Sequence, residues 1–129
     1  MESNLFSMES LPKDLADLVR SEKYYGQMNG PDGSAYIKGA CGDQMEFYLV
    51  ISDGRITGIK FHTDGCFYTT ACGAMTCKLA DGQTIAGALS ISASEVIGEI
   101  KTLPRNHIHC AILAVSTLYK AIADYLLKP

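Results

Sequence analysis

The sequence lacks any block of Lys or Arg: its 11 basic residues are scattered among 14 acidic ones, and the formal net charge is −3. Proteins that follow a nucleic-acid backbone need clustered positive charge, so we do not expect a nucleic-acid partner. The first residues, Met1-Glu2-Ser3-Asn4, lack the basic start and apolar core of a signal peptide, and no apolar run approaches the ~20 residues that cross a bilayer. We therefore expect a cytoplasmic protein without a membrane partner.

Linkers, internal repeats and low-complexity tracts are also missing from the 129 residues. Apolar residues make up 47% of the chain, which is too many for a disordered protein and enough for a real core. We expect a single domain over residues 1–129, in which residues 1–9 form a loose lead-in because they show no clear period.

The hydrophobic pattern changes its period along the chain. Alternation with a period of two predicts a β-hairpin, in which Asp53-Gly54 is a strong tight-turn signal. After Asp64-Gly65 the period is helical, and Ser10, Ser92 or Ser94 can cap helices. The expected strands lie at 34–38, 45–51 and 55–63, and the expected helices at 66–79, 84–89, 94–101 and about 107–127, with one more beginning at residue 10.

This order of elements predicts an α+β fold. Strands first and helices afterwards favour a small three-stranded antiparallel sheet with helices packed on one face, together with a long C-terminal helix. One stripe of that last helix is apolar and is expected to face the core. The stripe comprises Ile112, Val115, Tyr119, Ile122 and Leu126.

The chain has five cysteines, and their number is odd. Because the expected compartment keeps thiols reduced, metal binding or thiol chemistry is favoured over a disulfide framework. The alternative is that free cysteines are small buried apolar residues. Cys72 and Cys77 fit that alternative, because they lie about 9 Å and about 16 Å beyond Cys66 along one predicted helix.

The remaining cysteines have neighbours suited to metal binding. Cys41 and Asp43 would point to the same side of an extended segment. Cys66 and Cys110 each lie near a predicted helix start, where the helix dipole favours a thiolate, and His109 can coordinate iron or zinc. Three thiolates with one harder ligand suit an iron–sulfur cluster that is built and handed on. Buried structural cysteines, or a thiol enzyme in which His109 activates Cys110, remain alternatives.

The combined motif resembles the NifU/IscU-type iron–sulfur cluster assembly scaffolds. It consists of Gly39-Ala40-Cys41-Gly42-Asp43, then Gly65-Cys66, then Leu103-Pro104 followed by His109-Cys110. The resemblance implies that the chain is one N-terminal-type scaffold domain and not an enzyme, and that Cys41, Asp43, Cys66, His109 and Cys110 form the assembly site. It also implies that Cys110 receives persulfide sulfur and that Asp43 keeps the cluster labile.

The same resemblance implies what the site handles and what binds the protein. Iron and persulfide sulfur from a cysteine desulfurase would form a transient 2Fe-2S cluster, which passes to apo iron–sulfur acceptor proteins, and zinc can occupy the ligands of the apo form. An electron donor and a second copy of the chain are further candidate partners. The alternative function is a zinc-binding sulfur-transfer protein that accepts persulfide without building a cluster.

The chain also departs from the family pattern. Scaffolds served by a dedicated Hsp70-type chaperone have Leu-Pro-Pro-Val-Lys before His-Cys, whereas this chain has Leu103-Pro104-Arg105-Asn106-His107, so chaperone recognition of that kind is not favoured. His107 stands where the family has a lysine, and we expect it to be a surface, structural or outer-shell residue. The family pattern does not explain Cys72 and Cys77.

Overall fold

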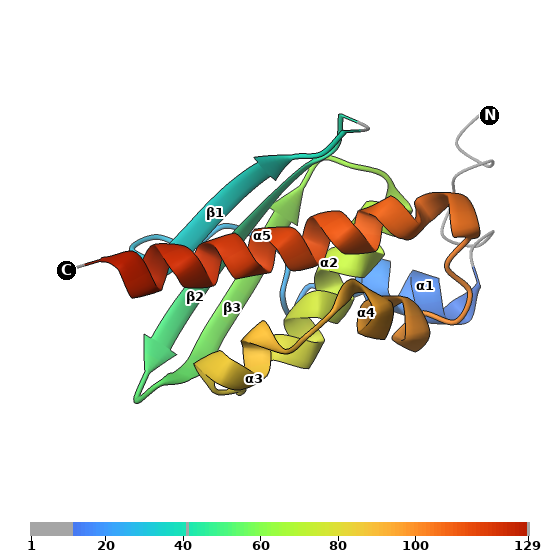
Figure 1. Ribbon diagram of the computed structural model, residues 1–129. Helices are drawn as coiled ribbons and strands as arrows, with labels where there is room; N and C mark the ends of the chain where they lie inside the picture. Colours follow the sequence, from blue (N-terminus) through green and yellow to red (C-terminus); the bar gives the residue numbers. More distant parts are fainter. Residues whose placement is uncertain (1–11, 41, 129) are drawn as a thin grey trace.

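A three-stranded antiparallel sheet and five α-helices make up the fold, in a computed structural model that describes residues 12–40 and 42–128 (Figure 1). The predicted α+β class is confirmed. The strands follow the order β1-β2-β3 and comprise β1 (Gly33–Lys38), β2 (Gln44–Ser52) and β3 (Arg55–Thr63). The helices are α1 (Lys13–Arg20), α2 (Phe67–Ala80), α3 (Ile85–Leu89), α4 (Ala93–Glu99) and α5 (Ile108–Leu127), and a 3-10 turn, η3 (Arg105–His107), precedes α5.

The β2–β3 hairpin forms as its pattern predicts. Asp53 and Gly54 both have positive φ, 54° and 74°, as a type I′ turn requires. Phe47 pairs with Phe61 across the two strands, and both side chains are buried on the face that the helices cover. Alternate residues of β2 and β3 therefore build one wall of the core.

Helices α5 and α2 form the layer that covers the sheet (Figure 1). Helix α5 crosses β1 and β2, whereas α2 lies against β3 and α5, with α1 packed on its other side. The approach of α5 to β1 is close, because a Cβ atom at Gly33 would lie 2.5 Å from the carbonyl oxygen of Ala121. This packing brings the starts of α2 and α5 to the same end of the layer.

The predicted core face of α5 is partly wrong. Val115 and Ile122 are buried as expected, but Ile112 is 52% exposed and Leu126 55% exposed. Three alanines lie among the larger apolar residues of the buried face, and they let the helix approach the sheet closely. That face comprises Cys110, Ala111, Leu113, Ala114, Val115, Thr117, Leu118, Ala121 and Ile122.

The helical stretch Arg105–Leu127 is long and apolar enough to cross a membrane by length and composition, which corrects the expectation that no apolar stretch approaches that length. Half of its most apolar window is buried inside the fold, as is common for the core helix of a globular domain.

Helix boundaries agree with the predictions to within a few residues. Ser92 caps α4 by accepting a hydrogen bond from the N–H of Glu95, and Thr84 caps α3 in the same way. Helix α1 begins after Pro12, so the predicted cap at Ser10 and the lead-in over 1–9 lie outside the described residues. His107 belongs to η3, one residue before α5.

Substituting Gly73→Ala tests the packing of α2 on β3. A Cβ atom at Gly73 would lie 2.5 Å from the ring of Phe61, so the substitution should lower the free energy of unfolding by about 1–3 kcal/mol. Urea unfolding followed by circular dichroism measures this change. The control is Gly98→Ala in α4, where the added Cβ meets open space and should raise stability by roughly 0.5–1 kcal/mol. Equal stability of the two variants would contradict the packing.

Candidate metal site

Two thiols meet where α2 and α5 begin. Cys66 is the N-cap residue of α2 and is exposed, whereas Cys110 lies in the first turn of α5 and is 1% exposed. The two Sγ atoms and a ring nitrogen of His107 all lie within 4.8 Å of one another. Two helix starts that are remote in sequence therefore bring together three potential metal ligands.

Both neighbouring histidines contact the buried thiol. The Nδ1 atom of His107 lies 3.8 Å from Cys110 Sγ, and the Nε2 atom of His109 lies 3.7 Å from it. His109 is exposed and does not belong to the compact set formed with Cys66, whereas His107 is half-buried and does. The sequence pattern favoured His109 as a ligand and left His107 outside the ligand set. The spacing of His107 and Cys110, three residues or about one helical turn apart, is the signal that could have indicated their contact.

Thr69 links the predicted carboxylate ligand to the thiols. Its buried hydroxyl donates a hydrogen bond to Asp43 Oδ2 at 2.5 Å. The hydroxyl oxygen of Thr69 also lies 3.4 Å from Cys110 Sγ and 3.6 Å from Cys66 Sγ. A Cβ atom at Gly65 would lie 2.7 Å from Asp43 Oδ2, so a side chain at that position would displace the carboxylate. The sequence analysis did not identify Thr69, because a threonine inside a helix carries no distinctive spacing.

The predicted ligand Cys41 lies outside the described residues, so its convergence with the other ligands stays a prediction. Its neighbours are described. The N–H of Gly39 donates to the carbonyl of Asp43, and the N–H of Gly42, whose φ is 96°, donates to the carbonyl of Gly39. These bonds close a tight loop that directs Asp43 toward Thr69.

The two thiols differ in their affinity for a proton. A hydrogen bond from the Cys110 thiol is the main cause that lowers the pKa of Cys66 to about 5; backbone N–H groups at the start of α2 and the Thr69 hydroxyl add to it, and desolvation opposes it. The same hydrogen bond, together with burial, raises the pKa of Cys110 above its ordinary value. Cys66 is therefore the thiolate of the pair in the metal-free protein.

Cys72 and Cys77 are core residues, as predicted. Both are fully buried in α2. Burial raises the pKa of Cys72 to about 12 and the pKa of Cys77 well above its ordinary value. Neither thiol is therefore a ready nucleophile at neutral pH.

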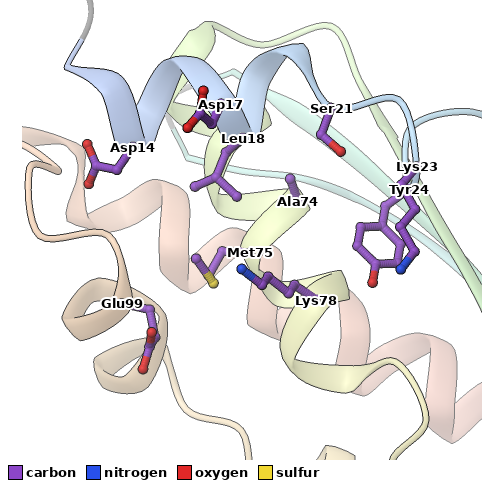
Figure 2. Close-up of a pocket in the computed structure, with 10 residues that line it drawn as sticks. All are labelled: Asp14, Asp17, Leu18, Ser21, Lys23, Tyr24, Ala74, Met75, Lys78 and Glu99. Carbon is purple, nitrogen blue, oxygen red and sulfur yellow. The ribbon is translucent and has the colours of Figure 1, made fainter.

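A cavity of about 480 Å³ lies elsewhere, between α1, α2 and α4 (Figure 2). Figure 2 shows Leu18 of α1 and Met75 of α2 on its walls, with charged side chains around them. Lys78, which also lines it, follows Cys66 by about 18 Å along α2. The cavity is thus separate from the thiols and contributes none of the candidate ligands.

Substituting Thr69→Val should destabilise the metal-free protein. The substitution keeps the shape but removes the hydroxyl that Asp43 accepts from, which costs about 1–3 kcal/mol of unfolding free energy. Thr69→Ser keeps the hydroxyl and removes one methyl group, for a cost of about 0.8 kcal/mol. Urea unfolding under reducing conditions compares the two variants. A valine variant that is at least as stable as the serine variant would contradict the role of the hydrogen bond.

Alkylation should distinguish the two thiols by pH. In reduced, metal-free protein the rate of Cys66 alkylation by iodoacetamide should rise with pH and level off above its pKa of about 5, while Cys110 stays unmodified through neutral pH. Peptide mass spectrometry follows each thiol separately. Cys110→Ala should move the Cys66 profile to higher pH because it removes the main hydrogen bond, whereas the remote Cys77→Ala should leave the profile in place. A Cys66 profile that Cys110→Ala does not move would refute this assignment.

Comparison with known proteins identifies the family. Residues 13–129 match the family described as the NifU-like N terminal domain. The iron–sulfur cluster assembly scaffold protein IscU 1 of Archaeoglobus fulgidus is 35% identical over 113 residues, which cover 87% of this chain and 74% of that protein. The scaffold protein IscU of Rickettsia prowazekii is 31% identical over 118 residues, covering 91% of this chain and 85% of that protein.

Solved structures share the fold. A putative iron–sulfur cluster assembly scaffold protein for the SUF system from Fervidobacterium islandicum matches with a TM-score of 0.71 at 19% identity, covering 90% of this chain and 98% of that one. A NifU-like N-terminal protein from Brucella abortus matches with a TM-score of 0.72 at 17% identity, covering 95% and 100% of the two chains. On the family match and the sequence identity to the two scaffold proteins, the chain belongs to the NifU-like N-terminal domain family.

Proposed function

We propose that this protein is a scaffold on which an iron–sulfur cluster is assembled and from which it is passed on. The observation that carries the proposal is the meeting of two thiols with the carboxylate of Asp43 around the buried hydroxyl of Thr69. Cysteine thiolates are the usual ligands of such clusters, and a carboxylate is a harder, weaker ligand for the same iron. The names of the relatives support a scaffold over the zinc-binding sulfur-transfer alternative.

The cluster is cargo in this proposal, so each ligand must hold it and release it. Cys66 and Cys110 supply thiolates, and the resemblance adds the thiol of Cys41 to them. Asp43 supplies the ligand that can be displaced when an acceptor thiolate competes for the iron. Cys110 is the proposed persulfide acceptor. Its thiol is buried and holds its proton in the metal-free protein, so accepting sulfur requires that Cys110 be uncovered and deprotonated when the donor binds.

The finer points of the proposal follow from the resemblance. The cargo is a 2Fe-2S cluster, the sulfur donor is a cysteine desulfurase in the cytoplasm, and the acceptors are apo iron–sulfur proteins. The protein itself does not turn over a substrate: the desulfurase breaks the carbon–sulfur bond, and the scaffold collects its product. Zinc would occupy the same ligands in the apo form.

Anaerobic reconstitution tests the function. Reduced protein incubated with ferrous iron, cysteine, a cysteine desulfurase and dithiothreitol, which supplies the electrons that reduce persulfide sulfur to sulfide, should develop the visible absorption and the acid-labile sulfide of a cluster. The variant Cys66→Ser should fail to do so. The control Cys77→Ser, whose thiol lies in the core away from the site, should develop the cluster, provided that its circular dichroism is unchanged. No cluster on the unaltered protein would sink the proposal.

Asp43→Ala tests how the cluster is released. The loaded variant should lose its cluster to a chelator or an apo acceptor several-fold more slowly than the unaltered protein, because a stronger donor, such as a thiolate from solution, can take the position that the carboxylate vacates. The decay of visible absorption after mixing gives the rate. Unchanged or faster loss would show that Asp43 does not act as the weak ligand.

A further inference from the structure

We propose that His107 is a metal ligand, and that Cys66, His107 and Cys110 hold a single tetrahedral metal ion, zinc or ferrous iron. This deepens the proposed function, because such an ion would occupy the assembly site. His109 would remain on the solvent side of that ion. The sequence pattern alone favoured the opposite assignment of the two histidines.

The distances fit a shared ion. A tetrahedral zinc ion with a sulfur ligand at about 2.3 Å and a nitrogen ligand at about 2.05 Å places the two ligand atoms about 3.6 Å apart. His107 Nδ1 and Cys110 Sγ are 3.8 Å apart, and Cys66 Sγ lies within 4.8 Å of Cys110 Sγ and of a ring nitrogen of His107. Adjustments of less than about 1 Å, the size of a small side-chain rotation, would bring all three atoms to one ion.

The His107 ring is held in place by its surroundings. It packs against the ring of Tyr68, with centroids 4.1 Å apart and planes inclined by 31°, and its backbone N–H donates to the carbonyl of Pro104 at 2.9 Å. Tyr68 belongs to the first turn of α2, two residues after the Cys66 cap. The stacking therefore ties the imidazole to the helix that carries one thiol, while η3 ties it to the helix that carries the other.

His109 differs in each of these respects. It is exposed, it lies outside the compact set with Cys66, and its ring centroid lies 5.9 Å from that of His107. Its Nε2 atom lies 3.7 Å from Cys110 Sγ. An ion bound between the two thiols would therefore meet the imidazole of His107 first.

The donor set suits the proposed ions. Two thiolates and one neutral imidazole balance the charge of a divalent cation, and both donor types bind zinc and ferrous iron well. Three ligands leave one of four tetrahedral positions open, as in sites where a bound ion exchanges a ligand during its work. Incoming sulfur or another side chain could take that position.

Matched phenylalanine variants test the assignment. His107→Phe keeps a ring against Tyr68 but removes its nitrogens, and His109→Phe makes the same change at the exposed position. Cobalt(II), a spectroscopic substitute for zinc, is titrated into reduced, metal-free protein, and its thiolate charge-transfer and tetrahedral d–d bands give the dissociation constant. His107→Phe should weaken binding about 100-fold or more, since loss of even an outer-shell partner costs about 10–100-fold. His109→Phe should change it less than about threefold.

A second measurement uses the unaltered chain and so stands even if His107→Phe folds poorly. Stoichiometric zinc added to protein labelled with ¹⁵N in histidine should shift the imidazole Nδ1 resonance of His107 and leave those of His109 near their metal-free positions. A zinc shift at His109, or equal loss of cobalt binding in both variants, would overturn the assignment. Because neither measurement involves cluster assembly, normal metal binding through His107 without reconstitution would refute the scaffold and leave this inference standing.

Discussion

The contact between the first turns of α2 and α5 is the constraint on which the site depends. Thr69 lies fully buried in this contact, and its hydroxyl touches Asp43 and both thiols. A buried hydroxyl is costly unless it is hydrogen-bonded, so the carboxylate of Asp43 stabilises the close contact between the two helices. The packing of the helices in turn favours a position of Asp43 near the thiols. The loop that carries Asp43 is fixed to the helices by the same bond.

The unequal thiols have a consequence for metal binding. Cys66 is a thiolate because Cys110 donates its proton toward it, so the pair of thiols carries one negative charge instead of two in the metal-free protein. A metal ion that binds both sulfurs must displace this proton, because the thiolate is the form that coordinates. Binding is thus coupled to proton release, and a proton returned to Cys110 favours departure of the ion. In such a site, the proton of Cys110 competes with the metal ion for the sulfur.

Local rules predicted most of the fold. The Asp53-Gly54 turn, the alternation around Phe47 and the cap at Ser92 are set by near neighbours in the chain, and all three formed as expected. The buried face of α5 was misjudged because the helix packs closely against the sheet through alanines, which leaves the larger side chains of Ile112 and Leu126 exposed. Part of the site could be predicted. The sequence indicated that Cys66 and Cys110 each lie at a helix start and could share a metal. Which histidine faces Cys66 depends on the turn before α5, whose conformation no sequence pattern specifies.

The position of the ligands explains how the chain can depart from its family's pattern without disturbing the fold. Cys66, His107 and Asp43 all lie just outside regular elements, at a cap, in a short turn and in a loop, whereas the core is built from the interiors of strands and helices. A lysine replaced by histidine at position 107 changes no buried packing between α5 and the sheet, since η3 lies beyond it. The substitution therefore acts at the candidate site: it exchanges a permanent cation for an imidazole that stacks on Tyr68 and can ligate a metal when neutral.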